Sequence, residues 1–237
     1  MPQSQGNARN ILVGASPLFI SSVDSTSANY VENAEAGVLN GSVPAFASST
    51  SYTDTLNAVT SGNFYYRNVG YTNNGLQITY NPTYDSVTVD QLLDTAKLFK
   101  SSMEVMIATE MTEGTLENTL VVFGQKTSTL TTSGTGATTV KTLGFEAGAL
   151  GQAPTERQLI AVGQAPTSSS AFGTANNPTA TERVYYARRV LSVQQSQFSL
   201  ARTAPTTFPV TFRLLPDANY AGSEYGKIID RIVTYPA

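Results

Sequence analysis

The 237-residue sequence contains no cysteine, no histidine and no tryptophan. Without cysteine, the chain can form neither a disulfide nor a thiolate metal site, as is usual for proteins made in a cytoplasm. Without histidine, it lacks the usual base of a nucleophilic triad, and the patterns Gly-x-Ser-x-Gly and Ser-x-x-Lys are absent as well. We therefore expect no enzyme activity, no cofactor and no metal site.

Charged residues are also scarce, at 13% of the sequence, and the net charge is −3. This balance gives no basic surface of the kind that tight DNA-binding proteins need. Residues 1–125 hold eleven acidic and four basic residues, whereas 126–237 hold six acidic and ten basic ones. Two interpretations stay open: a chance partition between strands that pair with each other, or complementary surfaces for self-association.

Long apolar runs are missing too. No window approaches the roughly 18 unbroken apolar residues of a membrane-spanning helix, so we expect no insertion into a membrane. The run from Ile11 to Ile20 is interrupted by Gly14 and Pro17, and only Arg9 precedes it. This pattern favours a first β-strand over a secretory signal peptide.

What the sequence does contain, Ser, Thr, Asn, Gly and Tyr in quantity, favours a mainly β fold. Apolar and polar residues alternate in Leu76–Tyr80 and in Val87–Asp90, and we interpret Asn81–Asp85 as the connection of a hairpin between them. One face of this predicted hairpin is polar and has no basic residue: Gln77, Thr79, Asn81, Thr88 and Asp90. Further strands are expected at 11–20, 64–67, 103–107, 157–162, 182–193, 207–215 and 227–233.

Residues 112–123 have the pattern of an α-helix. Thr112 is the expected N-cap, Glu113 would lie in the first turn, and Gly124 would end the helix in the left-handed conformation. Three apolar residues share one helical face and are expected to pack on a sheet: Leu116, Leu120 and Phe123.

We expect a single domain over residues 1–237 with long connections. Residues 21–60 are weakly patterned, which predicts a long loop or an extended arm. A compact domain seldom carries so long a connection without a surface to lie on, so its length suggests contact with another subunit. Residues 126–140 and 164–181 are predicted to be flexible loops, with a loose hairpin tip as the alternative for 126–140.

Several acidic residues are candidates for catalysis or for metal binding. The pairs Asp90/Asp94 and Glu104/Glu110 could serve glycoside hydrolysis, although sugar sites usually also contain tryptophan. Asp85 together with Asp90 and Asp94 could offer oxygen atoms to calcium, but the spacing is not that of an EF-hand. A solvated strand face is the favoured interpretation of these carboxylates.

The sequence also has a small basic group, Arg183, Arg188 and Arg189. Period-two alternation places Arg188 on the face opposite the other two. We therefore favour ion pairs within the sheet over a nucleic-acid patch.

Seven short motifs follow one another between residues 60 and 235. They are Arg67–Thr72, Gly75–Tyr80, Asp90–Gln91, Glu113–Leu120, Glu156–Ile160, Arg183–Tyr185 and Thr207–Asp217. Their order, with a single helix between strands, resembles that of the major tail tube proteins of long-tailed bacteriophages, especially phages of actinobacteria. The segments 1–60, 126–150 and 164–181 match nothing in that family that we can place.

The resemblance implies a β-sandwich or barrel subunit with one packed helix, six copies of which close into a ring. Rings would stack into a hollow, non-contractile tube in the virion, assembled from protein made in the host cytoplasm. It also implies contacts with tape measure, tail tip and terminator proteins, and transient, non-specific passage of double-stranded DNA. The polar face at Gln77–Asp90 would then be a candidate for the channel wall.

A second class of function stays open. A β-sandwich binding module, such as a capsid decoration protein or an adhesin, could present its Ser/Thr-rich loops as a recognition surface. Formation of rings or tubes by the purified protein would separate the two classes.

Overall fold

The computed structural model describes residues 16–32, 55–57, 65–92, 94–165, 179–193, 197–198, 200 and 205–234. Strands account for 50% of the chain, which confirms the predicted mainly β fold. Within the described ranges there is one α-helix, α2 (Leu116–Val122), and two 3-10 turns, η2 (Thr127–Thr129) and η3 (Gly136–Thr138). The strands are β1 (Leu18–Ser21), β2 (Thr55–Asn57), β3 (Tyr65–Asn68), β4 (Thr72–Thr88), β5 (Thr95–Met111), β6 (Leu130–Ser133), β7 (Val140–Leu143), β8 (Arg157–Gln164), β9 (Thr179–Ser192), β10 (Phe208–Leu214) and β11 (Gly226–Thr234).

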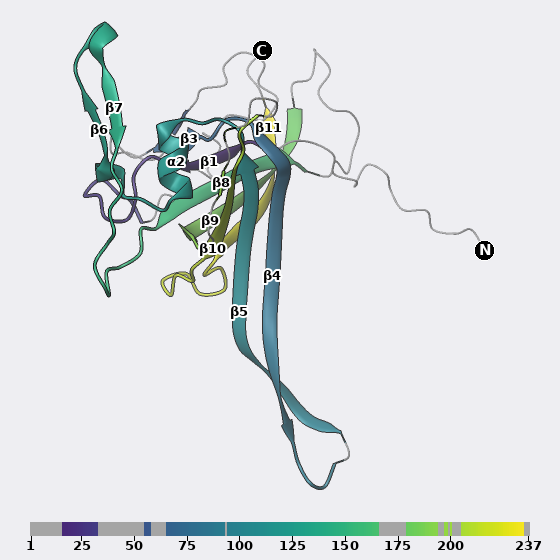
Figure 1. Cartoon of the computed structure of the whole chain (residues 1–237). Helices are drawn as coiled ribbons and strands as arrows, with labels where there is room; N and C mark the ends of the chain where they lie inside the picture. The colour runs from purple at the N-terminus through teal and green to yellow at the C-terminus, as the bar shows by residue number, and fades with distance from the viewer. Residues whose placement is uncertain are drawn as a thin grey trace.

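Nine strands form one antiparallel sheet in the order β2-β3-β1-β8-β9-β10-β5-β4, with β11 also paired to β9. The sheet divides along β9, because β11 pairs with residues 179–187 of that strand whereas β10 pairs with residues 190–192. Beyond this point β4 and β5 leave the body as a long hairpin (Figure 1). The strands β6 and β7 form a separate two-stranded sheet that projects from the other side of the body.

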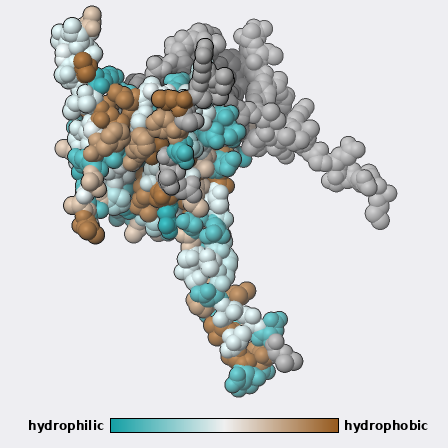
Figure 2. Space-filling view, viewed as in Figure 1, coloured by the Kyte–Doolittle hydropathy of each residue, from teal (hydrophilic) through white to brown (hydrophobic). Residues whose placement is uncertain are grey.

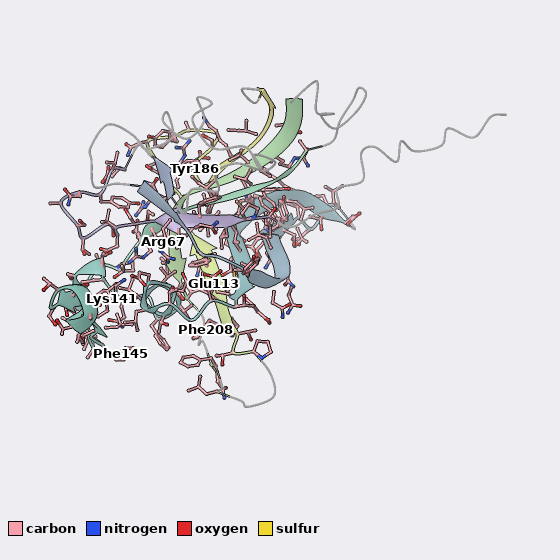
Figure 3. The ribbon with its side chains drawn as sticks, turned by 90° about the horizontal axis from the view of Figure 1, so that it is seen from above. Arg67, Glu113, Lys141, Phe145, Tyr186 and Phe208 are labelled. Atoms are coloured by element: carbon pink, nitrogen blue, oxygen red, sulfur yellow. The ribbon has the colours of Figure 1, made fainter. Side chains whose placement is uncertain are left out.

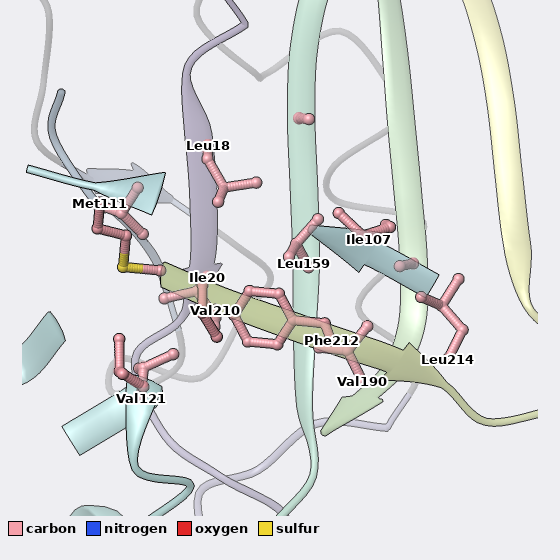
Figure 4. Packing of buried hydrophobic residues seen from close by; sticks show 14 of the residues in the cluster. Leu18, Ile20, Ile107, Met111, Val121, Leu159, Val190, Val210, Phe212 and Leu214 are labelled. Carbon is pink, nitrogen blue, oxygen red and sulfur yellow. The ribbon is translucent and has the colours of Figure 1, made fainter. Parts of the chain in front are cut away.

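The main hydrophobic core lies where side chains from both branches of the sheet meet. Leu18, Ile20 and Leu159 of β1 and β8 belong to it together with Ile107 of β5 and Phe212 of β10 (Figure 4). Each of these side chains is at most 3% exposed. Burying an apolar side chain of this size stabilises the folded chain by about 1.5–3 kcal/mol. This core therefore fixes the branch that carries the long hairpin to the rest of the sheet.

A second cluster covers the opposite face of the same central strands. Phe19 of β1, Ile160 of β8 and Val184 of β9 lie in it with Tyr66 and Tyr186. Because β1 and β8 are buried on both faces, neither strand shows the simple apolar-in, polar-out alternation of a half-exposed strand. This explains why the sequence pattern alone gave their positions only approximately.

Strand β10 confirms the alternation read from the sequence. Phe208, Val210, Phe212 and Leu214 are buried, and the residues between them are half-buried or exposed. Pro209 lies where β10 pairs with β5 but not with β9, so it has a neighbouring strand on one side only. Such a position is one of those at which a sheet accepts proline.

The predicted hairpin within Leu76–Asp90 is wrong. Residues 72–88 form one continuous strand, β4, and its partner along the whole length is β5. The segment Asn81–Asp85, interpreted as a turn because of its proline, instead pairs with residues between 99 and 104. Proline is compatible with this position because β4 is the last strand of the sheet and its outer edge has no neighbouring strand among the described residues.

The turn signal Asn73-Asn74-Gly75 marks a bulge rather than a chain reversal. Asn74 and Gly75 have φ of 60° and 67°, and the register shifts between the pairs Asn73–Glu110 and Gln77–Ala108. The Thr109 hydroxyl donates to the Gly75 carbonyl at 2.9 Å, which holds the bulge in place. The left-handed backbone that these residues favour is thus used to bend β4 as it leaves the body.

The helix is present, but it begins later than predicted. Thr115, not Thr112, is the N-cap, and its hydroxyl accepts from the Asn118 amide at 3.2 Å. Glu113 lies before the helix, where its carboxylate accepts from the Tyr71 amide at 3.0 Å (Figure 3). The end is as predicted: Gly124 has φ of 61°, and its amide donates to the Val121 carbonyl.

The buried face of the helix is also shifted. Leu120 is buried as expected, but Leu116 and Phe123 are half-buried, and Val121 and Val122 contribute to the core instead. A helix of two turns that packs against both a sheet and the β6–β7 hairpin buries more than one stripe. The predicted single stripe is therefore only partly right.

The predicted loops differ in outcome. Residues 126–140 contain β6 and the start of β7, whose four pairs run from Leu130–Leu143 to Ser133–Val140, so the hairpin alternative is confirmed. Of the segment 21–60, Ser21 ends β1, residues 22–32 form a loop packed on the body rather than an extended arm, and 55–57 form β2. Residues 33–54, 58–60 and 166–178 lie outside the described residues.

Candidate functional site

The face of β4, β5 and β10 opposite the core is mostly polar and open to solvent. Side chains directly opposite each other in antiparallel neighbours share a face of the sheet. By the observed register, this face carries Gln77, Thr79 and Asn81 of β4, Ala108, Met106 and Glu104 of β5, and Thr211 and Arg213 of β10. We call this set the polar sheet face. It contains three of the five predicted polar residues, all of them on β4.

The other two predicted residues do not belong to it. Thr88 differs from Gln77 by an odd number of positions on one continuous strand, so alternation places it on the other face. Asp90 lies beyond the end of β4, in the turn where the Leu92 amide donates to the Val89 carbonyl. The pattern missed this because it placed a chain reversal between the two runs.

Charges on the polar sheet face are few and partly paired. Arg213 lies 3.6 Å from the Glu104 carboxylate, and both side chains are partly exposed. Such an exposed pair contributes about 0–1 kcal/mol. Farther along β5, the Glu110 carboxylate accepts a hydrogen bond from the side-chain amide of Asn73 at 3.2 Å. The face therefore shows no excess of positive charge.

The hairpin β4–β5 extends far beyond its last contact with β10, the pair Arg213–Met106. Residues 80–92 and 94–105 lie past that point, and we call them the arm. At about 3.3 Å per residue, the arm projects by roughly 35 Å. Figure 2 shows it standing clear of the body, with apolar side chains gathered toward its far end.

The far end of the arm is unusually apolar for a solvent-exposed hairpin. We call residues 84–92 and 94–99 the arm tip. Its large exposed apolar side chains come from both strands and from the turn: Tyr84, Val87, Val89, Leu92, Leu98 and Phe99. Leu92 and Leu98 are 58% and 64% exposed. A contiguous patch of this kind on a soluble protein marks an interaction surface.

An open groove of about 720 Å³ lies at the root of the arm. Strands β4 and β5 provide one wall with Ile78, Tyr80 and Met103, and the segment 214–228 provides the other with Leu214 and Ile228. The lining is mostly apolar, and Ile228 is 64% exposed. We call this feature the root groove. Sequence reasoning missed it because its two walls are more than a hundred residues apart.

Of the two carboxylate pairs considered for glycoside hydrolysis, Glu104/Glu110 does not meet its geometry. Glu104 and Glu110 lie six residues apart on β5, so their side chains are separated by roughly 20 Å, whereas such enzymes need about 5–9.5 Å. Asp90 and Asp94 lie in the exposed turn of the arm, where the Asp94 carboxylate accepts from the Thr95 amide. In the described ranges, no group of three acidic side chains could hold a metal ion.

Of the three arginines in the basic group, two form ion pairs and the third is buried. Arg183 pairs with Asp230 at 2.6 Å, and Arg189 pairs with Glu156 at 2.6 Å, as the sequence interpretation favoured. Arg188 is buried, with its guanidinium 3.6 Å from the centre of the Tyr220 ring. The register between β8 and β9 shifts at these positions, between the pairs Arg157–Val190 and Leu159–Ala187.

A buried ion pair fixes the loop at residues 21–32. The Asp24 carboxylate accepts from the amides of Thr127 and Thr26, and Arg157 lies 3.7 Å from it. Burial raises the pKa of Asp24, but these hydrogen bonds outweigh burial and leave that pKa below its ordinary value. Burial lowers the pKa of Arg157 to about 10, so it stays charged at neutral pH.

A second buried network of hydrogen bonds is centred on Gln158 and also contacts this loop. The Gln158 side chain donates to the Val31 carbonyl at 2.7 Å and accepts from the hydroxyls of Tyr66 and Tyr186 at 2.5 and 3.2 Å. Burial raises the pKa of Tyr30 to about 12 and that of Tyr66 well above its ordinary value, so both phenols stay protonated. These groups serve the fold rather than chemistry.

No protein-family model matches this chain, and no curated protein matches it either. In the described ranges, no helix is long and apolar enough to cross a membrane.

Proposed function

We propose that this chain is a structural protein of a bacteriophage virion. Six copies would close a ring, and rings would stack into the non-contractile tail tube that conducts the genome into the host. Support comes from the order of the seven motifs, together with a mainly β fold that holds one described helix and one long arm. The tail-tube type of sandwich or barrel is part of this proposal.

The observation that carries the proposal is the polar sheet face. The strands β9, β10, β5 and β4 are consecutive neighbours in the sheet, so each copy can offer four strands to an inner barrel. About 24 strands spaced about 4.8 Å and tilted about 40° enclose a backbone diameter of roughly 48 Å. Side chains narrow this channel but leave room for duplex DNA.

The chemistry of the face suits such a channel. Each lysine or arginine that neutralises a phosphate adds affinity, and affinity on the path of a moving polyanion acts as friction. The polar sheet face offers hydroxyls, amides and carboxylates, and its Arg213 lies beside Glu104. We therefore assign Gln77, Thr79 and Asn81 as lumen residues.

The proposal includes partners and a place of action. Tape measure, tail tip and terminator proteins would contact the tube, and the subunit would act in the tail of the virion after synthesis in the host cytoplasm. Contact with double-stranded DNA would be transient and independent of sequence.

Electron microscopy of the purified full-length chain tests this directly. The expected result is six-fold rings or hollow tubes. Monomers that stay dispersed at every concentration would overturn the proposal. They would favour a binding module, for which the projecting, threonine-rich β6–β7 hairpin offers a surface.

A further inference from the structure

We propose that the arm tip of one copy docks into the root groove of a second copy. This inference rests on the proposed function, because it names the contact by which copies join. It assigns a partner to two surfaces that the fold leaves exposed, one at each end of the arm.

The arm tip needs a covering surface. A two-stranded hairpin is marginally stable in water unless a third strand or another layer packs on it. Here β4 and β5 have no third strand among the described residues beyond the pair Arg213–Met106. The tip also exposes apolar side chains on both faces, so a single covering layer would leave one face in water. A groove with two walls fits this shape better than a flat surface does.

The root groove is apolar on both walls and is open. Tyr80 and Met103 on one wall lie across from Leu214, Pro216 and Ile228 on the other. At about 720 Å³, the space is large enough for several apolar side chains of the tip. Filling it would remove Ile228 and Tyr80 from water, each of which is more than half exposed in the free chain.

The tip cannot enter the groove of its own chain. Lys100 is the outermost residue of β5 in the groove lining, and it pairs with Tyr84. From Tyr84 to the turn at Asp90 the strand runs a further six residues, or roughly 20 Å at about 3.3 Å per residue. The two strands stay paired out to Thr88–Thr95, with two register shifts on the way, and this pairing keeps the turn away from the groove. The occupant must therefore come from another molecule.

Charge favours a second copy as that molecule. The tip carries Asp85, Asp90 and Asp94 but only one lysine, Lys97. The groove lining carries Lys100 and Lys227 with one carboxylate, Glu224. The two surfaces are thus opposite in net sign, so their approach is favoured and like surfaces repel each other. Every copy has one tip and one groove, so the contact is head-to-tail and repeats until it closes into a ring or continues as a filament.

The absence of cysteine from the chain allows a sharp test. The double variant Leu92→Cys with Ile228→Cys places one thiol in the tip and one in the groove, both at exposed positions. Treatment of the assembled full-length protein with a short bismaleimide should give a ladder of covalent oligomers beyond the dimer. Either single variant can give dimers at most.

Leu150 supplies the matched control, since it is an exposed leucine in a loop outside both surfaces. The variant Leu150→Cys with Ile228→Cys should give no ladder. If the tip–groove variant assembles but gives no ladder, or no more than this control, the inference is overturned.

Electron microscopy of the same samples separates the two claims. Rings or tubes without a ladder would overturn the tip–groove contact and leave the proposed function intact. A ladder without rings or tubes would support the contact and contradict the tail tube. Absence of both would overturn both.

Discussion

Strands β4 and β5 pass through two environments within one hairpin. Near the body, Val105 and Ile107 are at most 7% exposed, because side chains of β1 and β8 pack over them. Farther out, Tyr84 and Leu98 on the same face of the hairpin are 58% and 64% exposed. Apolar side chains occur in both regions, but in the root they keep to one face and are covered within the chain, whereas at the arm tip they lie on both faces and are exposed.

This difference shows what a strand pattern can and cannot determine. Alternation identifies the side chains that favour burial in the root, where the apolar residues keep to one face of each strand. It does not say whether the covering layer belongs to the same chain. Phe212 lies in the buried region and Phe99 in the exposed arm tip, so substituting each of them tests the comparison.

Phe212→Ala should lower the free energy of unfolding of the free subunit by about 3–5 kcal/mol, because it opens a cavity in the main core. Phe212 is 1% exposed and belongs to the cluster that joins both branches of the sheet. Urea denaturation of the monomer measures this value. A loss below about 1 kcal/mol would show that the two branches do not pack on each other.

Leu120→Ala should cost about 2–4 kcal/mol, and Leu116→Ala distinctly less. Leu120 is 3% exposed in the main core, whereas Leu116 is half-buried. Thermal melts of the two variants measure the ranking. Equal effects would restore the evenly buried stripe that the sequence pattern predicted.

Acid should weaken the body through Asp24. Since the folded state lowers the pKa of this carboxyl below its ordinary value of 3.8, the stabilisation is present above that value. It is lost as the pH falls through the lowered pKa, when the carboxylate is protonated and Arg157 loses its partner.

Asp24→Asn should therefore be less stable at neutral pH and should lose less stability between pH 5 and pH 2 than the natural chain, as denaturant titrations at each pH would measure. Asp90→Asn, in the exposed turn of the arm, is the matched control and should follow the natural chain. An Asp24→Asn curve parallel to that of the natural chain would contradict the assigned role of this carboxylate.

Phe99→Ala should change the stability of the free subunit by no more than about 0.5 kcal/mol, because a half-exposed arm residue has little packing to lose. Its effect should fall on assembly instead, as a higher protein concentration needed for tubes. Sedimentation measures that threshold. A large loss of monomer stability would show that the arm tip is covered within its own chain.

Thr79→Lys should leave both folding and tube assembly unchanged, because Thr79 is exposed on the polar sheet face. In the virion it would add one positive charge per subunit along the DNA path, and genome ejection should slow. Thr132→Lys, at an exposed position of β6 outside the polar sheet face and the arm tip, is the matched control and should eject at the normal rate. Equal ejection rates for both variants would remove the polar sheet face from the lumen.

The body of the fold follows closely from local pattern. The alternation in Phe208–Leu214, the strands near 157–162 and 182–193, and the helix end at Gly124 were all predictable, because each depends on periodicity or on one backbone conformation. The structure of the segment Asn73–Asp85 was not predictable in this way. Its Asn74-Gly75 pair and its Pro82 are both turn signals in the sequence. In the structure, however, Asn74-Gly75 forms a bulge and Pro82 lies on an edge strand, because pairing with β5 overrides the local preference for a turn.

The functional surfaces, too, were only partly predictable from the sequence. Gln77, Thr79 and Asn81 were identified from alternation alone, whereas Thr88 and Asp90 were misplaced with the turn. The root groove had no signal in the sequence, because it depends on how the segment 214–228 lies beside the arm. Long-range packing of this kind cannot be read from local periodicity.

Amide hydrogen exchange on the free and the assembled full-length protein tests the central claim most directly. The account predicts that peptides from β8 and β10 are strongly protected in both states, whereas residues 84–92 and 94–99 exchange rapidly in the monomer and become protected on assembly. Peptides from 214–228 should gain protection together with them. Arm-tip exchange that is already slow in the monomer, or that stays fast in the assembly, would contradict the account.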